Sequence, residues 1–254
     1  MNLVITMPVY NESDGIKCLL SDLQSRFQDF TLSIIIVNDC SIDSTGKTIN
    51  QIISQNNWDI TLINNETNRG HGPSTIQGLR ESLNHSPDLV LAIDGDGHFK
   101  ISEIEQCCKD FAILLPQILE GVRINRDDPM FRRYTTKFIR FLVFVASGNL
   151  PHDANTPVRI YNPAILKEIL LLIDDNLLTP NLFISSYARV KKFNILEQKI
   201  ISTARSRTSK LGTTWNQRFP VIPSKKYVRF CFLSIKQWFF YVHPTIRAIR
   251  KNSI

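Results

Sequence analysis

Residues 89–98 read LVLAIDGDGH, and this stretch decides the fold of the chain. Its first five residues form an apolar run of strand length, which is typical of a strand buried on both faces of a parallel sheet. Asp94 and Asp96 follow directly, where the chain turns. Because ligands of such sheets bind beyond the carboxyl ends of the strands, the stretch predicts a parallel sheet with an acidic site at its edge.

The residues around this stretch alternate between strand and helix patterns. Further apolar runs of strand length lie at 3–7, 32–37 and 60–63, and helical patterns lie at 15–27, 44–55 and 73–83. A fourth helix is predicted to begin at Ser102, since Ser102-x-x-Glu105 is a capping box ahead of an apolar run. Strand–helix alternation with short connections predicts an α/β fold, with a mostly parallel, Rossmann-like sheet and helices on both faces.

The second half of the chain is less regular. It contains strand patterns at 121–124 and around 193–199, helical patterns at 132–147 and after Pro163, and an aromatic helix near the end. No internal repeat interrupts it. A single α/β domain followed by amphipathic helices is therefore expected.

Composition narrows the class of protein. The chain of 254 residues has a net charge of +7, which favours phosphate-bearing partners such as nucleotides, anionic lipids or nucleic acid. Its five cysteines include no Cys-x-x-Cys pair, so a reducing compartment is expected. The sequence opens on a strand pattern without a signal peptide, and no apolar stretch reaches the ~18 residues of a membrane span. We expect a cytoplasmic protein.

The acidic turn after the fourth strand is the candidate metal site. Residues i and i+2 of an extended chain face the same side, so Asp94 and Asp96 can converge on one ion. Hard oxygen ligands suit Mg²⁺ or Mn²⁺ carrying a diphosphate, and His98 is a further candidate ligand. The competing interpretation is a solvated turn, because Asp and Gly are favoured in turns. Three other polar strand ends favour the site.

Those strand ends carry side chains suited to a nucleotide. Pro8, Tyr10 and Glu12 follow the first strand, and Asn38 and Asp39 follow the second. Asp39 can accept hydrogen bonds from a base or ribose, whereas capping of the next helix suits Asp43 or Ser44 better.

The third strand is followed by Asn68-x-Gly70-x-Gly72. This pattern lacks the spacing of the common nucleotide-binding glycine loops, and a tight turn before a helix explains it equally well.

Taken together, these motifs resemble the inverting family 2 glycosyltransferases of the GT-A fold. The resemblance is strongest to the polyprenyl-phosphate group typified by dolichol-phosphate mannosyltransferase. It rests on the order and spacing of four segments, which read PVYNE at 8–12, VNDCSID at 37–43, NRGHG at 68–72 and DGD at 94–96. Cys40, Pro73 and His98 stand where that group usually has other residues.

The resemblance continues into the second half. Segments similar to the family's acceptor-phosphate region contain Arg123, Arg132, Thr136 and Asp153. Residues 153–161 have Pro157-Val158 in place of the usual Gly-Phe. The basic segment with Arg205, Arg207 and Lys210 is similar to the motif that reaches the donor diphosphate, without its customary glycine.

The resemblance implies a catalytic domain over residues 1–212, with a nucleotide-sugar half at 1–120 and an acceptor half at 121–212. Residues 213–254 would form an amphipathic, membrane-associated segment. A GDP- or UDP-linked donor would bind with Mg²⁺ or Mn²⁺, and the acceptor would be a lipid phosphate. Arg123 would then act in catalysis beside Asp94 and Asp96, and it would hold the acceptor phosphate together with Arg132. No strong base is needed, because a phosphate acceptor is already an anion.

Two helical patterns predict contact with a membrane surface. On a helical wheel the cations of the last helix form a narrow stripe against a broad aromatic face, and Pro244 is expected to kink or interrupt that helix. The stripe consists of Lys225, Arg229, Lys236, His243, Arg247 and Arg250, and a similar one contains Arg133, Lys137 and Arg140. Alternatively, both helices cover the sheet or join a second copy or a small membrane-protein partner.

Three other functions compete with this hypothesis. The acceptor could be a glycan hydroxyl, for which a catalytic base would be expected. A non-catalytic relative would bind nucleotide only, yet both aspartates of the metal motif are present. Nucleic-acid binding is disfavoured, because the aromatic residues cluster with aliphatic ones instead of alternating with basic residues.

Overall fold

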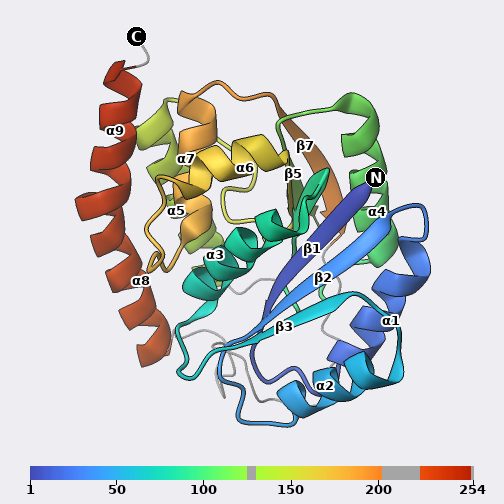
Figure 1. Cartoon of the computed structure of the whole chain (residues 1–254). Coiled ribbons are helices and arrows are strands. Elements are labelled where there is room, and N and C mark those ends of the chain that lie inside the picture. Colours follow the sequence, from blue (N-terminus) through green and yellow to red (C-terminus); the bar gives the residue numbers. More distant parts are fainter. Residues whose placement is uncertain (125–129, 202–223, 253–254) are drawn as a thin grey trace.

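The computed structural model describes residues 1–124, 130–201 and 224–252. Within these residues the chain folds around one seven-stranded sheet with the order β3-β2-β1-β4-β6-β5-β7 (Figure 1). The strands are β1 (Asn2–Val9), β2 (Thr31–Asn38), β3 (Ile60–Asn64), β4 (Leu89–Ala92), β5 (Ile118–Ile124), β6 (Arg159–Tyr161) and β7 (Ile195–Ile201).

The sheet is parallel except for β6, which runs antiparallel to both β4 and β5. β1 lies between β2 and β4, with Ile5 opposite Ile34 on one side and Leu91 on the other. Successive strands step away from β1 toward β3, and the chain then returns to place β4 on its other side. This reversal puts the loops after β1 and β4 next to each other, the usual position of a ligand site.

Helices cover both faces of the sheet, which confirms the predicted fold class. α1 (Ile16–Arg26), α2 (Thr45–Gln55) and α4 (Ile101–Leu114) cover one face. α3 (His71–Ser82), α6 (Pro163–Leu170) and α7 (Pro180–Val190) lie on the other face. α5 (Met130–Ser147) and α9 (His243–Asn252) pack against α7 on the outside, and α8 (Lys225–Gln237) precedes α9. A short 3₁₀ turn, Leu83–His85, follows α3.

The two faces explain the unbroken apolar runs. In β4, Leu89 and Leu91 pack into the core beneath α1, α2 and α4, while Val90 and Ala92 pack into the core beneath α3 and α7. A strand sandwiched between two helical layers has no solvent-facing side, so each residue gains from being apolar.

The start of α4 differs from the prediction. The helix begins at Ile101, and no side chain caps the position at Lys100. Glu105 forms an ion pair with Lys109 at 2.8 Å instead of reaching back to the first turn. The capping box expected at Ser102 is therefore wrong, because Glu105 has a partner one turn further along the helix.

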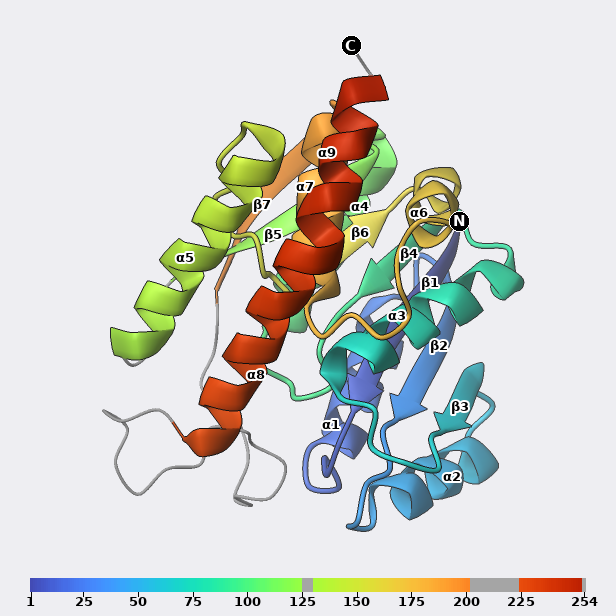
Figure 2. The same ribbon diagram turned by 90° about the vertical axis from the view of Figure 1, so that its left-hand side faces the viewer.

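The C-terminal helices form one long rod against the domain (Figure 2). α8 continues through a π-helical turn, Trp238–Val242, into α9, and this change of hydrogen bonding ends just before Pro244. Trp238, Val242 and Ile246 are buried in the same core as α5 and α7. No helix in the described ranges is long and apolar enough to cross a membrane.

Candidate active site at the carboxyl edge of the sheet

Two aspartates follow β4, and each lies beside a histidine. Asp94 accepts a 2.8 Å hydrogen bond from Nε2 of His71, the first residue of α3. The carboxylate of Asp96 lies 3.5 Å from Nε2 of His98. His71 belongs to the segment that reads NRGHG at 68–72, and the sequence alone assigned it no role. The structure makes it the direct neighbour of the metal motif.

The charges at this point are coupled. Desolvation works to lower the pKa of the His71 imidazole, but the adjacent Asp94 carboxylate, with Asp96 and Asp39 beyond it, raises that pKa above its ordinary value. Desolvation works to raise the pKa of Asp94, but His71, Arg123 and His98 hold it below its ordinary value. Charged side chains at the ends of β2 to β5 therefore influence one another at this edge of the sheet.

The carboxylates at this edge suit a metal ion that binds together with a substrate diphosphate. Among the described residues, no three His, Cys, Asp or Glu side chains form a ready-made metal cage. Mg²⁺, and Mn²⁺ by the same preference for oxygen, is commonly held by one or two carboxylates together with substrate phosphates. Asp94 and Asp96 fit such a pair, and their role as metal ligands, with His98 as a third, stays a prediction.

Asp39 organises the loop that follows β3. Its buried carboxylate accepts hydrogen bonds from the backbone N–H groups of Arg69 and Gly70, both at 2.8 Å, and from Asn65 at 3.0 Å. The side chain of Asn68 donates to the Asp39 carbonyl. Asp39 therefore ties the end of β2 to the loop before α3, in addition to its predicted role in base or ribose binding, which stays a prediction.

The loops after β1 and β2 are tied together in the same way. Asp43 accepts from the backbone N–H of Thr45 and of Ser13, and these bonds outweigh burial and lower the pKa of Asp43. Ser44 occupies the cap position of α2 without a side-chain hydrogen bond. Of the two predicted capping residues, Asp43 therefore has this role. Asn38 contributes a 2.8 Å bond to Asn64 across the neighbouring strands.

Two glycines at the start of α3, one just before the helix and one in its first turn, are required by geometry. Gly70 has φ of 90°, a conformation that residues with a Cβ rarely adopt. A Cβ at Gly72 would lie 2.2 Å from the carbonyl oxygen of Leu177 and 2.5 Å from that of Leu178. The segment before α7 thus packs directly onto the loop that carries His71.

Arg123 and Asp153 form a bidentate ion pair. Nε of Arg123 lies 2.7 Å from one carboxylate oxygen of Asp153 and a terminal nitrogen lies 3.0 Å from the other. The same nitrogen donates to the carbonyl of Asn155 at 2.9 Å. The two predicted acceptor residues are therefore brought together, but part of the guanidinium fork is engaged within the protein.

The remaining predicted site residues lie at the same edge or outside the described residues. Pro8, Tyr10 and Thr136 are half-buried, and Glu12 is buried with its backbone N–H bonded to Thr45. The side chain of Arg132 and all of Arg205, Arg207 and Lys210 lie outside the described residues.

Behind Asp153 lies a buried ionic network that sequence reasoning did not find. Glu120 pairs with Arg159 and Arg189, each at 2.8 Å, and all three are almost fully buried. Arg159 also donates to the carbonyl of Ala154, next to Asp153. Charged residues inside strand and helix patterns were the available signal, since buried charges require partners.

Comparison with known proteins identifies the family. Residues 4–171 match the family described as Glycosyl transferase family 2. The chain belongs to this family. It is 25% identical over 181 residues to the UDP-N-acetylglucosamine–dolichyl-phosphate N-acetylglucosaminyltransferase of Methanococcus voltae, covering 65% of this chain and 71% of that protein.

A second relative gives a similar result. The undecaprenyl-phosphate 4-deoxy-4-formamido-L-arabinose transferase of Serratia proteamaculans is 26% identical over 168 residues, or 65% of this chain and 50% of that protein. This glycosyltransferase chain therefore spans about half the length of several curated relatives that it matches.

Solved structures place the fold among the GT-A glycosyltransferases. The mannosyltransferase PcManGT from Pyrobaculum calidifontis, in complex with GDP-Man and Mn²⁺, matches with a TM-score of 0.56 at 14% identity, covering 98% of this chain and 73% of that one. S. aureus TarS 1-349 in complex with UDP matches with a TM-score of 0.53 at 20% identity, covering 82% and 59%. At these identities the likeness concerns the fold.

Proposed function

We propose that this enzyme transfers a sugar from a GDP- or UDP-linked donor to a polyprenyl phosphate at a membrane surface. The observation that carries the proposal is the juxtaposition of the Asp94–Asp96 turn with Arg123, which is close enough to lower the pKa of Asp94. An acidic turn suited to a metal diphosphate would thus lie near a guanidinium suited to a second phosphate. The names of the two relatives supply the chemical class of the acceptor.

Mg²⁺ or Mn²⁺ would be held by Asp94 and Asp96, with His98 as the candidate third ligand. When bound, the ion would neutralise charge that develops on the departing nucleoside diphosphate. The loops held by Asp39 and Asp43 would receive the nucleoside, beside Tyr10 and Glu12. Arg205, Arg207 and Lys210 are proposed to add positive charge at the diphosphate.

The acceptor side fits a phosphate better than a hydroxyl. A hydroxyl acceptor needs a general base within hydrogen-bonding reach. Among the residues that the structure describes, the Asp153 carboxylate lies on this side, and both of its oxygens accept hydrogen bonds from Arg123. An anionic phosphate can attack the anomeric carbon without giving up a proton. Arg123, Arg132 and Thr136 are proposed to position it.

The surface of α5 and α8 supports action at a membrane. Several large apolar side chains on these helices and the π-turn are exposed, at positions Phe141, Phe144, Phe232, Phe239 and Phe240. Exposed cations accompany them at Arg133, Lys137, Arg229 and Lys236. The two helices lie on the same side of the molecule (Figure 2). An apolar face edged by cations suits the interface of an anionic bilayer, so we propose a cytoplasmic enzyme peripheral to the membrane.

The test is incubation with radiolabelled nucleotide-sugars, Mn²⁺ and either a polyprenyl phosphate or soluble glycans. We expect label to enter the organic phase only with the polyprenyl phosphate, and chelation of the metal to prevent it. Label that appears solely in the glycans would replace this proposal with the hydroxyl-acceptor alternative. Donor binding without transfer to any acceptor would favour a nucleotide-binding relative.

A further inference from the structure

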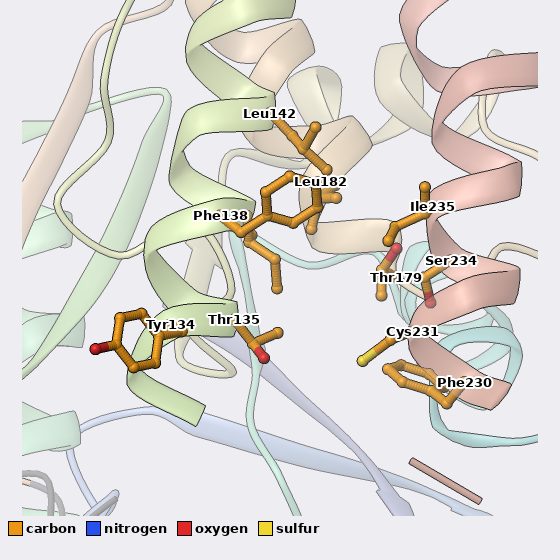
Figure 3. Close-up of a pocket in the computed structure, with 11 residues that line it drawn as sticks. Tyr134, Thr135, Phe138, Leu142, Thr179, Leu182, Phe230, Cys231, Ser234 and Ile235 are labelled. Carbon is orange, nitrogen blue, oxygen red and sulfur yellow. The ribbon is translucent and has the colours of Figure 1, made fainter. Parts of the chain in front are cut away.

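An apolar cavity of about 290 Å³ lies between α5, α7 and α8 (Figure 3). Its walls include Phe138 and Leu142 from α5, Leu182 from α7 and Ile235 from α8. Ligand pockets in proteins usually have volumes of ~300–1,000 Å³. This cavity lies at the lower end of that range, so it has room for a short segment of a slender apolar molecule and not for a bulky one. It is too small for a partner helix, which is ~10–12 Å in diameter.

The sequence of α8 leaves this space unfilled. Ser234 is 9% exposed, lines the cavity, and its hydroxyl has no hydrogen-bond partner among the described residues. A leucine or phenylalanine at this position would occupy the space and bury more apolar surface. Near the N-terminal ends of α5 and α8, the hydroxyl groups of Thr135 and Tyr227 lie 2.6 Å apart and join the two helices.

One wall of the cavity belongs to the same segment that supports the donor loop. Thr179 lines the cavity, and the preceding residues Leu177 and Leu178 place their carbonyls against Gly72. Gln237 of α8 accepts a 2.9 Å hydrogen bond from the backbone N–H of Leu178. The cavity is therefore connected through two residues to the loop that carries His71.

The other wall leads to the acceptor side. α5 follows β5, which ends one residue after Arg123. The first turns of α5 and α8 lie toward the end of the molecule to which the arrowheads of β1 and β2 point (Figure 2). Asn181 of α7 donates to the carbonyl of Thr156 in the loop after Asp153. The helices α5 and α7, which line the cavity, therefore connect it to the segments that carry Arg123 and Asp153.

We infer that this cavity holds the phosphate-proximal isoprene units of the acceptor while its phosphate lies at Arg123. This inference rests on the proposed function. The occupant has an anionic end and a slender apolar chain, which matches the guanidinium of Arg123 and an apolar cavity lined by α5, the next helix along the chain. A polyprenyl phosphate would then bind more tightly than a phosphate with one isoprene unit, because only the longer chain fills the cavity.

Photolabelling tests the site without requiring transfer. The full chain in detergent is exposed to a polyprenyl phosphate that carries a diazirine on its second isoprene unit, and the labelled peptides are mapped. We expect label on α5, α7 or α8 that unlabelled polyprenyl phosphate removes and phosphatidylglycerol does not. Label confined to other segments would overturn the inference. Equal competition by phosphatidylglycerol would overturn it too, because the cavity would then hold an ordinary acyl chain.

Substitutions in α8 test whether the cavity determines the preference for a long-chain acceptor. Ser234→Phe fills the cavity, Ser234→Ala keeps it open, and Val228→Phe adds bulk at an exposed position of the same helix that does not line it. We expect Ser234→Phe to lower the ratio of kcat/KM for polyprenyl over prenyl phosphate by about tenfold or more, since several methylene groups lose their contacts. The other two variants keep that ratio.

Each outcome separates the inference from the proposed function. If Ser234→Phe does not fold, as judged by its thermal unfolding, Cys231→Phe replaces it, because Cys231 lines the same cavity. An unchanged ratio in a folded, cavity-filled variant overturns the inference while leaving the transferase proposal intact. Specific photolabelling without transfer to any phosphate overturns the proposed function while leaving a lipid-phosphate site.

Discussion

The donor and acceptor sides of the site are built differently. On the donor side, the carboxylates of Asp39 and Asp43 accept hydrogen bonds from backbone N–H groups and so join the loops after β1, β2 and β3. On the acceptor side, Arg123 is held by Asp153, and the loop around Asp153 is supported by buried Arg159. Both arrangements join residues about 30 positions apart in the sequence. The first uses backbone N–H groups as donors to a carboxylate, and the second uses a pair of charged side chains.

This difference indicates how the geometry of the donor side and of the acceptor side is fixed. Carboxylates that accept backbone N–H bonds fix a loop regardless of which side chains the loop carries. Paired charges fix a site only when both partners and their supports are in place. The donor side should therefore tolerate change in the acceptor side, and the two should separate in kinetic experiments.

The largest effect is expected from Asp96→Asn. Loss of one metal-binding carboxylate should lower the rate of transfer by about 10³-fold, comparable with loss of a main electrostatic stabiliser. The thermal unfolding midpoint should change little, because Asp96 lies in a turn. Rates with saturating donor measure the effect, and Asp22→Asn on the exposed side of α1 is the matched control. Wild-type turnover by Asp96→Asn would remove the metal role.

The next effect concerns stability. Glu120→Gln leaves Arg159 without its buried anion and Arg189 with only the partly exposed Glu197, and should lower the free energy of unfolding by about 3 kcal/mol at pH 7. Although burial works to raise the pKa of Glu120, the two arginines hold it below its ordinary value.

This pKa shift sets the pH dependence of the difference. The stabilisation by Glu120 is present above its ordinary pKa and is lost as the pH falls through the lowered folded value. Urea unfolding should therefore show the difference between wild type and Glu120→Gln narrowing below about pH 4. Glu105→Gln, which removes a helix-surface pair with Lys109, is the control, with an expected loss below ~1 kcal/mol. A difference independent of pH would contradict this account of the network.

A smaller effect separates the two sides kinetically. Arg123→Lys keeps the charge and loses the planar fork, so KM for the acceptor should rise about tenfold, which corresponds to ~1.4 kcal/mol. Binding of the nucleotide-sugar, measured by calorimetry, should stay within about twofold. An equal loss of donor binding would show that the two sides are not independent.

The smallest effect is expected at the membrane face. Phe240→Ser removes an aromatic side chain that is 79% exposed and should weaken binding to anionic vesicles by about fivefold, or ~1 kcal/mol. Ile113→Ser is the matched control, because Ile113 is 75% exposed on α4, across the sheet. Co-sedimentation with vesicles measures both variants. Equal losses would mean that the π-turn after α8 has no special part in membrane contact.

Sequence reasoning was most successful where neighbouring positions determine the structure. The apolar run before Asp94 predicted a buried strand and placed the acidic turn at the sheet edge. The pairing of Asp94 with His71 could not be predicted, since it depends on how α3 lies against β4. The capping box at Ser102 failed because a local pattern was overridden by the pair between Glu105 and Lys109.

The acceptor side was less predictable, because its contacts depend on how distant segments pack together. Arg123 and Asp153 were both expected near the acceptor phosphate, but their bidentate contact depends on the antiparallel insertion of β6 beside β5. The cavity near Ser234 results from the packing of three helices, so it could not be predicted from the residue pattern of any single helix.

The most direct test of the central claim is a crystal structure with Mn²⁺ and a nucleoside diphosphate, with the manganese located by anomalous scattering. The account predicts an anomalous peak bridging the diphosphate and the carboxylates of Asp94 and Asp96, with the His71 loop beside it. A nucleoside diphosphate bound at this edge without manganese, or manganese bound away from both aspartates, would contradict it.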